Sequence, residues 1–171
     1  MKLKPALLIS LLFLCSFKKG SEKIQWMKLD DITVKIKQEN KPVLIDLYTD
    51  WCYWCKVMDK KTYSNSKVID YINEHFYSAR VNAETKDAVT WNDKTFNYNN
   101  QYRINDFALF VTGGRASFPT TVILLGGNEP PIPIPGFMEP KEFEMVVKYF
   151  GDGEYKTKSF PEYQKTFKAS W

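Results

Sequence analysis

Cys52 and Cys55, two cysteines separated by two residues, are the strongest candidates in this sequence for a chemical function. They follow an apolar run within the stretch VLIDLYTDWCYWCK, residues 43–56. Proteins use a pair at this spacing to bind a metal ion, to form a structural disulfide, or to exchange electrons with other thiols. The rest of the sequence distinguishes between these uses.

Composition disfavours the first two uses. A structural zinc site takes four ligands, usually Cys and His, whereas this chain has three cysteines and one histidine. A disulfide between Cys52 and Cys55 closes a very small loop, and the stabilisation by a disulfide decreases as its loop shortens. We therefore expect no metal and no other cofactor, and we favour thiol–disulfide exchange.

The expected local structure makes Cys52 the nucleophile. The apolar run 43–49 predicts a buried strand, and the residues after the cysteines have helical character, which puts Cys52 at a helix N-terminus. Backbone N–H groups and the helix dipole favour a thiolate there, and the thiolate is the attacking species. Cys55, one turn along, is the thiol that resolves the mixed disulfide.

This segment resembles the active site of the thioredoxin family, in which a strand carrying an acid leads into Trp-Cys-x-x-Cys-Lys. The resemblance implies that Asp46, six residues before Cys52 (52 − 46), is a buried acid that helps move a proton to and from Cys55 through water. Burial raises the pKa of such an acid toward neutrality. Arg80 lies in ARVN, where many thioredoxins carry a lysine near that acid. The alternative for Asp46 is an exposed, inert acid at a strand end.

A second stretch, SFPTTVIL, resembles the segment in which thioredoxins place a cis-proline opposite the cysteines. The resemblance implies a cis bond before Pro119 and a backbone at Phe118 that pairs with an extended substrate peptide. It also implies that Gly136, after the last strand, lets a partner approach. Trp51 borders the same site. The alternative for Pro119 is an ordinary trans proline at a strand start.

Together these matches predict an α/β protein with the thioredoxin fold, a central mixed sheet flanked by helices. The resemblance covers residues 43–150. Helices are expected within residues 24–42, 53–64, 64–76 and 139–150, and strands within 43–49, 76–82, 120–125 and 130–137. An insertion around residues 83–115 precedes the cis-proline, and its part from 93 to 102 is expected to be helical. A tail begins near residue 151 and ends in a short docked helix.

Residues 1–20 have the layout of a secretory signal, because two lysines precede an apolar stretch that is too short to span a bilayer. A frayed hydrophobic helix is the alternative. The letters LFLC loosely resemble a bacterial lipoprotein signal, so Cys15 is either a lipidation site that tethers the protein to a membrane or a small apolar residue. We predict export to the periplasm, free or membrane-tethered, with residues 21–171 as the thioredoxin-like domain.

The charge distribution gives no support for a nucleic-acid partner. The chain has 24 basic and 20 acidic residues, but four lysines lie in the first twenty positions, and without them the charges balance (24 − 4 = 20). The predicted partners are exported proteins with disulfides and a second redox protein. We expect a reductant, because no histidine lies between the cysteines to stabilise a thiolate as strong oxidants require. A disulfide isomerase or oxidase, and a binding module without catalysis, are the alternatives.

Overall fold

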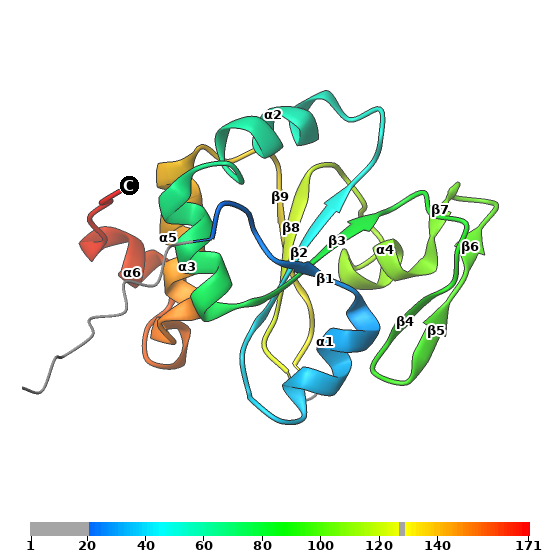
Figure 1. Ribbon diagram of the computed structural model, residues 1–171, viewed down its shortest axis with the longest axis horizontal. Coiled ribbons are helices and arrows are strands. Elements are labelled where there is room, and N and C mark those ends of the chain that lie inside the picture. The colour runs from blue at the N-terminus through cyan, green and yellow to red at the C-terminus, as the bar shows by residue number, and fades with distance from the viewer. Residues whose placement is uncertain (1–20, 127–128) are drawn as a thin grey trace, which may run out of the picture.

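A five-stranded sheet in the order β1-β3-β2-β8-β9 forms the centre of the protein (Figure 1). The computed structural model describes residues 21–126 and 129–171, so the expected signal segment and Cys15 lie outside the described residues. The strands are β1 (Trp26–Met27), β2 (Val43–Tyr48), β3 (Tyr77–Asn82), β8 (Thr120–Leu124) and β9 (Ile132–Pro135). β3 is parallel to β1 and β2, whereas β8 is antiparallel to β2 and β9. The predicted mixed sheet is confirmed.

Helices cover both faces of this sheet, because successive residues of its central strand point to opposite sides. The helices are α1 (Leu29–Ile36), α2 (Tyr53–Lys61), α3 (Ser66–His75), α4 (Asp106–Val111), α5 (Pro140–Gly151) and α6 (Phe160–Thr166). Leu44 of β2 packs with residues of α3 and α5, whereas its neighbour Ile45 packs with residues of α1 and α4. Figure 1 shows these two pairs of helices on opposite faces of the sheet. Burial on both faces explains why this strand is an unbroken apolar run.

A capping side chain and a proline mark the start of two of these helices. The Asn65 side chain accepts hydrogen bonds from the backbone N–H groups of Lys67 and Val68 and caps α3. Pro140 occupies the first turn of α5, where the missing N–H is not needed. None of the helices within residues 21–126 and 129–171 is long and apolar enough to cross a membrane.

The insertion contains two small hairpins, and the helix predicted for residues 93–102 is wrong. Its strands are β4 (Val89–Trp91), β5 (Lys94–Phe96), β6 (Tyr98–Asn99) and β7 (Ile104–Asn105), followed by α4. Asn92 and Asp93 form the two-residue turn between β4 and β5 with φ of 48° and 62°. Asn and Asp tolerate this left-handed region better than most residues, which favours a tight hairpin over a helix.

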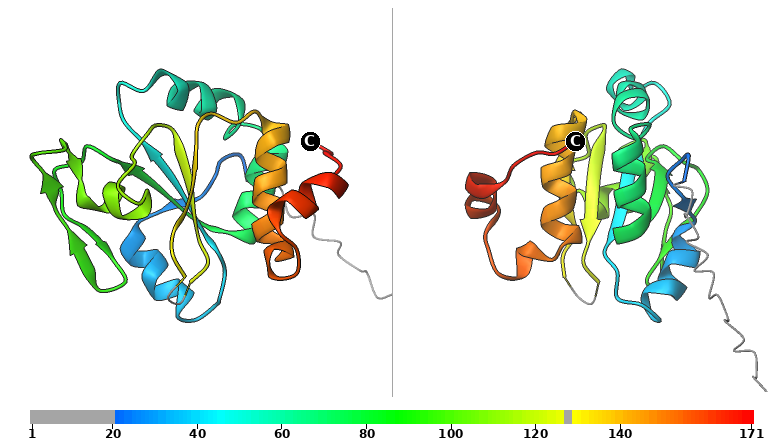
Figure 2. Two further views of the ribbon diagram at one scale, coloured as in Figure 1. Left: turned by 180° about the vertical axis from the view of Figure 1, so that it is seen from behind. Right: turned by 60° about the vertical axis from the view of Figure 1, so that its left-hand side comes forward.

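The C-terminal segment packs on the outer side of α5. After α5 the chain makes a short 3-10 turn (Glu154–Lys156) and enters α6, which the sequence predicted as a docked helix. The ring of Tyr163 in α6 lies 5.3 Å from that of Tyr149 in α5. The insertion and α6 therefore lie at opposite ends of the molecule (Figures 1 and 2).

Candidate active site

The two cysteines form a disulfide at the start of α2, with an S–S distance of 2.06 Å. Cys52 is the N-cap residue of the helix, and the backbone N–H of Cys55 donates a 3.0 Å hydrogen bond to its Sγ. The turn from β2 into α2 is closed by the Cys52 N–H, which donates to the carbonyl of Thr49 at 3.2 Å. The predicted position of Cys52 is confirmed, and the N–H that reaches its sulfur would also stabilise a thiolate.

Asp46 lies in the middle of β2, on the same face as Leu44, with 3% of its side chain exposed. Register pairs it with Arg80 of β3 on one side and with Thr121 of β8 on the other. Because Asp46 is buried, the alternative of an exposed, inert acid is wrong.

Arg80 joins this acid to α2. Its Nε lies 3.0 Å from Asp46 Oδ2, and its guanidinium donates a 2.6 Å hydrogen bond to Asp59 of α2. Asp59 is four residues after Cys55, so both lie on one face of the helix. Arg80 therefore links Asp46 to the face of α2 that also carries Cys55.

The contact between Arg80 and Asp46 acts by charge. No hydrogen bond of good geometry reaches Asp46 Oδ2, although that oxygen is buried. Burial has the largest effect and raises the pKa of Asp46 from 3.8 to about 7, against the opposing effect of the Arg80 charge. This agrees with the direction expected from the sequence, and a group with such a pKa can both release and accept a proton near pH 7.

Exposed aromatic side chains surround the disulfide. The residues Trp51, Tyr53 and Trp54 are 67%, 69% and 53% exposed. The Trp51 ring meets Phe118 edge to face at 6.2 Å, and the Trp54 ring stacks on Phe137 at 5.5 Å. Exposed apolar groups in one place are typical of a surface that contacts other molecules.

The cis-proline segment forms the other wall of this surface. The Phe118–Pro119 peptide bond is cis, as predicted. Gly136 follows β9 with φ 103°, and its N–H donates a 2.8 Å hydrogen bond to the Pro119 carbonyl. A side chain at Gly136 would be strained at this φ. A cavity of about 280 Å³ is lined by Trp54, Phe118, Pro119, Gly136 and Phe137.

The structure gathers Cys52, Cys55, Trp51, Phe118, Pro119 and Gly136 at one end of the sheet, with Asp46 inside β2, and it adds Phe137. The sequence analysis did not select Phe137, although its position directly after Gly136 was a signal for it. Trp54, the residue before Cys55, is likewise part of this surface. The stacking of Trp54 on Phe137 places both rings on the wall of the cavity.

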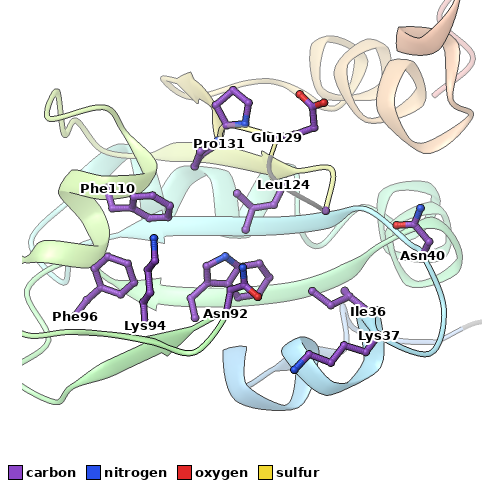
Figure 3. Close-up of a pocket in the computed structure, with 13 residues that line it drawn as sticks. Ile36, Lys37, Asn40, Asn92, Lys94, Phe96, Phe110, Leu124, Glu129 and Pro131 are labelled. Atoms are coloured by element: carbon purple, nitrogen blue, oxygen red, sulfur yellow. The ribbon is translucent and has the colours of Figure 1, made fainter.

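A second cavity, of about 610 Å³, lies at the opposite end of the sheet (Figure 3). It is bounded by the end of α1, the β4–β5 hairpin, α4 and the end of β8. Leu124 on its wall pairs with Val43, the first residue of β2, whereas Cys52 follows the last. No cysteine lines this cavity, and its position separates it from the chemistry of the disulfide.

A thioredoxin fold with a disulfide at the start of α2 and a cis-proline beside it defines the class of protein. Residues 29–151 match the model of the thioredoxin-like domain, and the chain belongs to this family. A thioredoxin-fold protein from Helicobacter pylori superposes with a TM-score of 0.58 at 23% identity, over 74% of this chain and 79% of that one.

Two relatives match shorter stretches. Spermatogenesis-associated protein 20 of Rattus norvegicus is 33% identical over 52 residues, which are 30% of this chain and 7% of that protein. Thiol:disulfide interchange protein DsbD of Pseudoalteromonas atlantica is 40% identical over 48 residues, which are 26% of this chain and 8% of that protein. The matched stretches thus span less than a tenth of either relative.

Proposed function

We propose that this chain is a thiol–disulfide oxidoreductase that exchanges disulfides with exported proteins. The observation that carries the proposal is the bond between Cys52 and Cys55 at the N-terminus of α2, a helix that Arg80 links to the buried acid Asp46. The name of the DsbD relative, a thiol:disulfide interchange protein, supports the same chemistry.

The reaction begins with the reduced pair. The Cys52 thiolate attacks one sulfur of a substrate disulfide, forms a mixed disulfide and releases the other substrate sulfur as a thiolate. The Asp46 carboxylate then takes the proton of the Cys55 thiol. The Cys55 thiolate attacks Cys52 Sγ, restores the internal disulfide and releases the reduced substrate. Two electrons pass from the cysteine pair to the substrate, and a second redox protein with a dithiol returns them.

The substrate binds as an extended segment across Trp51, Phe118, Pro119 and Gly136. The backbone at Phe118 pairs with the substrate chain, and the absence of a side chain at Gly136 leaves room for it. The exposed rings beside the disulfide bury apolar side chains of the substrate, which supports a protein rather than a small molecule as the partner.

The decisive experiment is the reduction of insulin disulfides by the chain from residue 21 onward. Wild type is expected to be active and Cys52→Ser inactive. The matched variant Cys55→Ser is expected to be inactive too but to accumulate a mixed disulfide through Cys52, because nothing resolves it. If Cys52→Ser keeps full activity, the proposal is wrong. If wild type exchanges no disulfide and Cys52→Ser still binds a partner protein, the chain is a binding module.

Direction is decided by the reduction potential of the pair in glutathione buffers. A reductant should equilibrate near about −270 mV, as thioredoxin does, whereas a value near about −120 mV would indicate an oxidase. The dipeptide Tyr53–Trp54 brings no positive charge to Cys52, which supports the reductant.

The place of action follows from residues 1–20, which carry the pattern of a secretory signal. We propose action in the periplasm, with Cys15 as the lipid attachment site. Fractionation of cells that express wild type and Cys15→Ser tests this. Release of only the variant from the membrane fraction supports a lipid tether, whereas identical distributions would contradict it.

A further inference from the structure

Tyr63 is a buried tyrosine that the steps above do not use. It lies just past the end of α2, is 7% exposed, and its backbone N–H donates a 3.0 Å hydrogen bond to the Met58 carbonyl. Trp26 and Phe143 meet its ring edge to face at 5.4 Å and 5.6 Å. These contacts fix the ring, so its hydroxyl is held in one place.

The buried Tyr63 hydroxyl neighbours the polar side chains of Asp46 and Thr121. Asp46 and Thr121 are register partners on neighbouring strands, and the Tyr63 hydroxyl is within interaction range of both. Tyr63 Oη, Asp46 Oδ2 and Thr121 Oγ1 are all buried without a hydrogen-bond partner among the described residues. Buried polar groups are normally paired, because an unpaired one costs about 1–3 kcal/mol. Three such groups side by side indicate a site whose bonding changes with protonation.

The charged groups around Asp46 leave room for a hydroxyl donor. Arg80 Nε lies 3.0 Å from Asp46 Oδ2 without forming a hydrogen bond of good geometry, and the guanidinium donates instead to Asp59 of α2. Asp59 carries the same charge as Asp46 and opposes its ionisation. Burial, followed by the nearby Asp46 charge, raises the pKa of Tyr63, so the phenol keeps its proton and remains a donor.

We propose that Tyr63 is a positioning residue for disulfide exchange, whose hydroxyl donates a hydrogen bond to the Asp46 carboxylate whenever that group is ionised. This inference rests on the proposed function. When Asp46 takes the proton from the Cys55 thiol, the carboxylate becomes a neutral acid and no longer needs the bond. When Asp46 returns the proton to a Cys55 thiolate, the bond forms again. Tyr63 exchanges no electrons and loses no proton.

Carbon-detected NMR of the Asp46 carboxyl in the oxidised protein tests the bond without any substrate. In wild type the carboxyl should titrate at about pH 7. Tyr63→Phe removes only the hydroxyl, and the midpoint should rise by about one pH unit, because a hydrogen bond to a charged group is lost. The matched control is Tyr163→Phe, another buried tyrosine far from the site, which should leave the midpoint unchanged. An unchanged midpoint in Tyr63→Phe overturns the proposal.

The kinetics of insulin reduction in single and double variants then test whether the hydrogen bond from Tyr63 to Asp46 contributes to disulfide exchange. The pH profile of insulin reduction should move upward in Tyr63→Phe, and the same substitution should have no further effect in an Asp46→Asn background. An effect that persists without the acid would show a merely structural role and overturn the proposal. If wild type reduces no disulfide at all, the proposed function fails, while the NMR titration still decides whether the bond exists.

Discussion

Two buried carboxylates at different places in this protein have opposite surroundings. Glu144 of α5 has no exposed side-chain surface and accepts hydrogen bonds from Lys148 Nζ at 2.7 Å, the Ser170 N–H at 2.8 Å and the Trp171 N–H at 3.0 Å. Asp46 is 3% exposed, and its buried oxygen Oδ2 accepts no well-formed hydrogen bond. Both are carboxylates shielded from water, so the difference lies in the donors around them.

The donors reverse the effect of burial. For each group burial by itself raises the pKa, and for Asp46 it prevails and the pKa reaches about 7. For Glu144 the hydrogen bonds from Lys148, Ser170 and Trp171 outweigh burial and hold the pKa below its ordinary value of 4.5. Glu144 therefore stays ionised at neutral pH and binds the C-terminal segment to α5. Asp46 is a group that changes its charge near neutral pH, as proton transfer requires.

The largest expected effect concerns Asp46 and pH. Its pKa is raised in the folded protein from 3.8 to about 7, so the folded state binds the proton more tightly than the unfolded state. Below about pH 4 Asp46 is protonated in both states and does not lower the free energy of unfolding. As the pH rises from about 4 to about 7, the free energy of unfolding falls by about 4 kcal/mol in total. Asp46→Asn should remove this loss and stabilise the oxidised protein by a similar amount at about pH 8.5. Urea unfolding across this range measures it.

The control for that experiment is Asp70→Asn, which changes an exposed carboxylate of α3. It should follow the wild-type pH dependence. If Asp46→Asn also follows it, then Asp46 is ionised at no cost in the native protein and the comparison with Glu144 breaks down.

Glu144→Gln should shift stability in the opposite direction. The substitution removes the charge that Lys148 and the two backbone N–H groups bind, and breaking such a buried pair costs about 3 kcal/mol. Urea unfolding at neutral pH measures the loss, with Glu74→Gln, whose side chain is 77% exposed, as the matched control. Equal stability of the two variants would show that the carboxylate contributes nothing.

Removal of Ser170 and Trp171 should produce a smaller loss. Glu144 would keep Lys148 but lose its other donors, and the ring contact between Trp171 and Tyr71 at 5.5 Å would disappear. We expect a loss of about 2 kcal/mol, because water replaces part of the lost hydrogen bonding. The loss should be clearly smaller in a Glu144→Gln background, where the charge on the acceptor is gone, and an undiminished loss there would assign it to the Trp171 ring instead.

The smallest effect on stability is expected at Trp54, on the wall of the cavity next to the disulfide. Trp54→Ala should leave urea unfolding nearly unchanged, because the side chain is 53% exposed. It should lower kcat/KM for insulin by about tenfold, the effect of losing an aromatic contact worth about 1.4 kcal/mol at a binding surface. Reduction of a small disulfide should be unaffected. Tyr102→Ala, which removes another exposed aromatic ring in the insertion, should change neither rate.

The sequence predicted the surroundings of Asp46 well and those of Glu144 hardly at all. Cys52, Asp46 and Pro119 are recognisable because each belongs to a short segment whose residues follow one another in the sequence. The fastening of Ser170 to Glu144 joins residues 26 positions apart, with no pattern to link them. Tyr63 is similar, because only the packing of α2 on the sheet brings its hydroxyl to Asp46.

The insertion shows why a predicted element can be wrong. Its polar and aromatic composition fits a helix or a hairpin equally well, and the choice depends on the left-handed turn at Asn92 and Asp93. The central sheet was predictable because strands such as β2 are buried on both faces and therefore uniformly apolar.

Alkylation of the reduced protein tests the central claim, that Cys52 is an activated thiol at a helix N-terminus, most directly. At about pH 6.5 an ordinary thiol is only about 1% ionised and reacts slowly with iodoacetamide. We predict that one residue, Cys52, is modified there at least about ten times faster than a free cysteine, and that Cys52→Ser abolishes the fast reaction. Reaction of both thiols no faster than free cysteine would contradict the account.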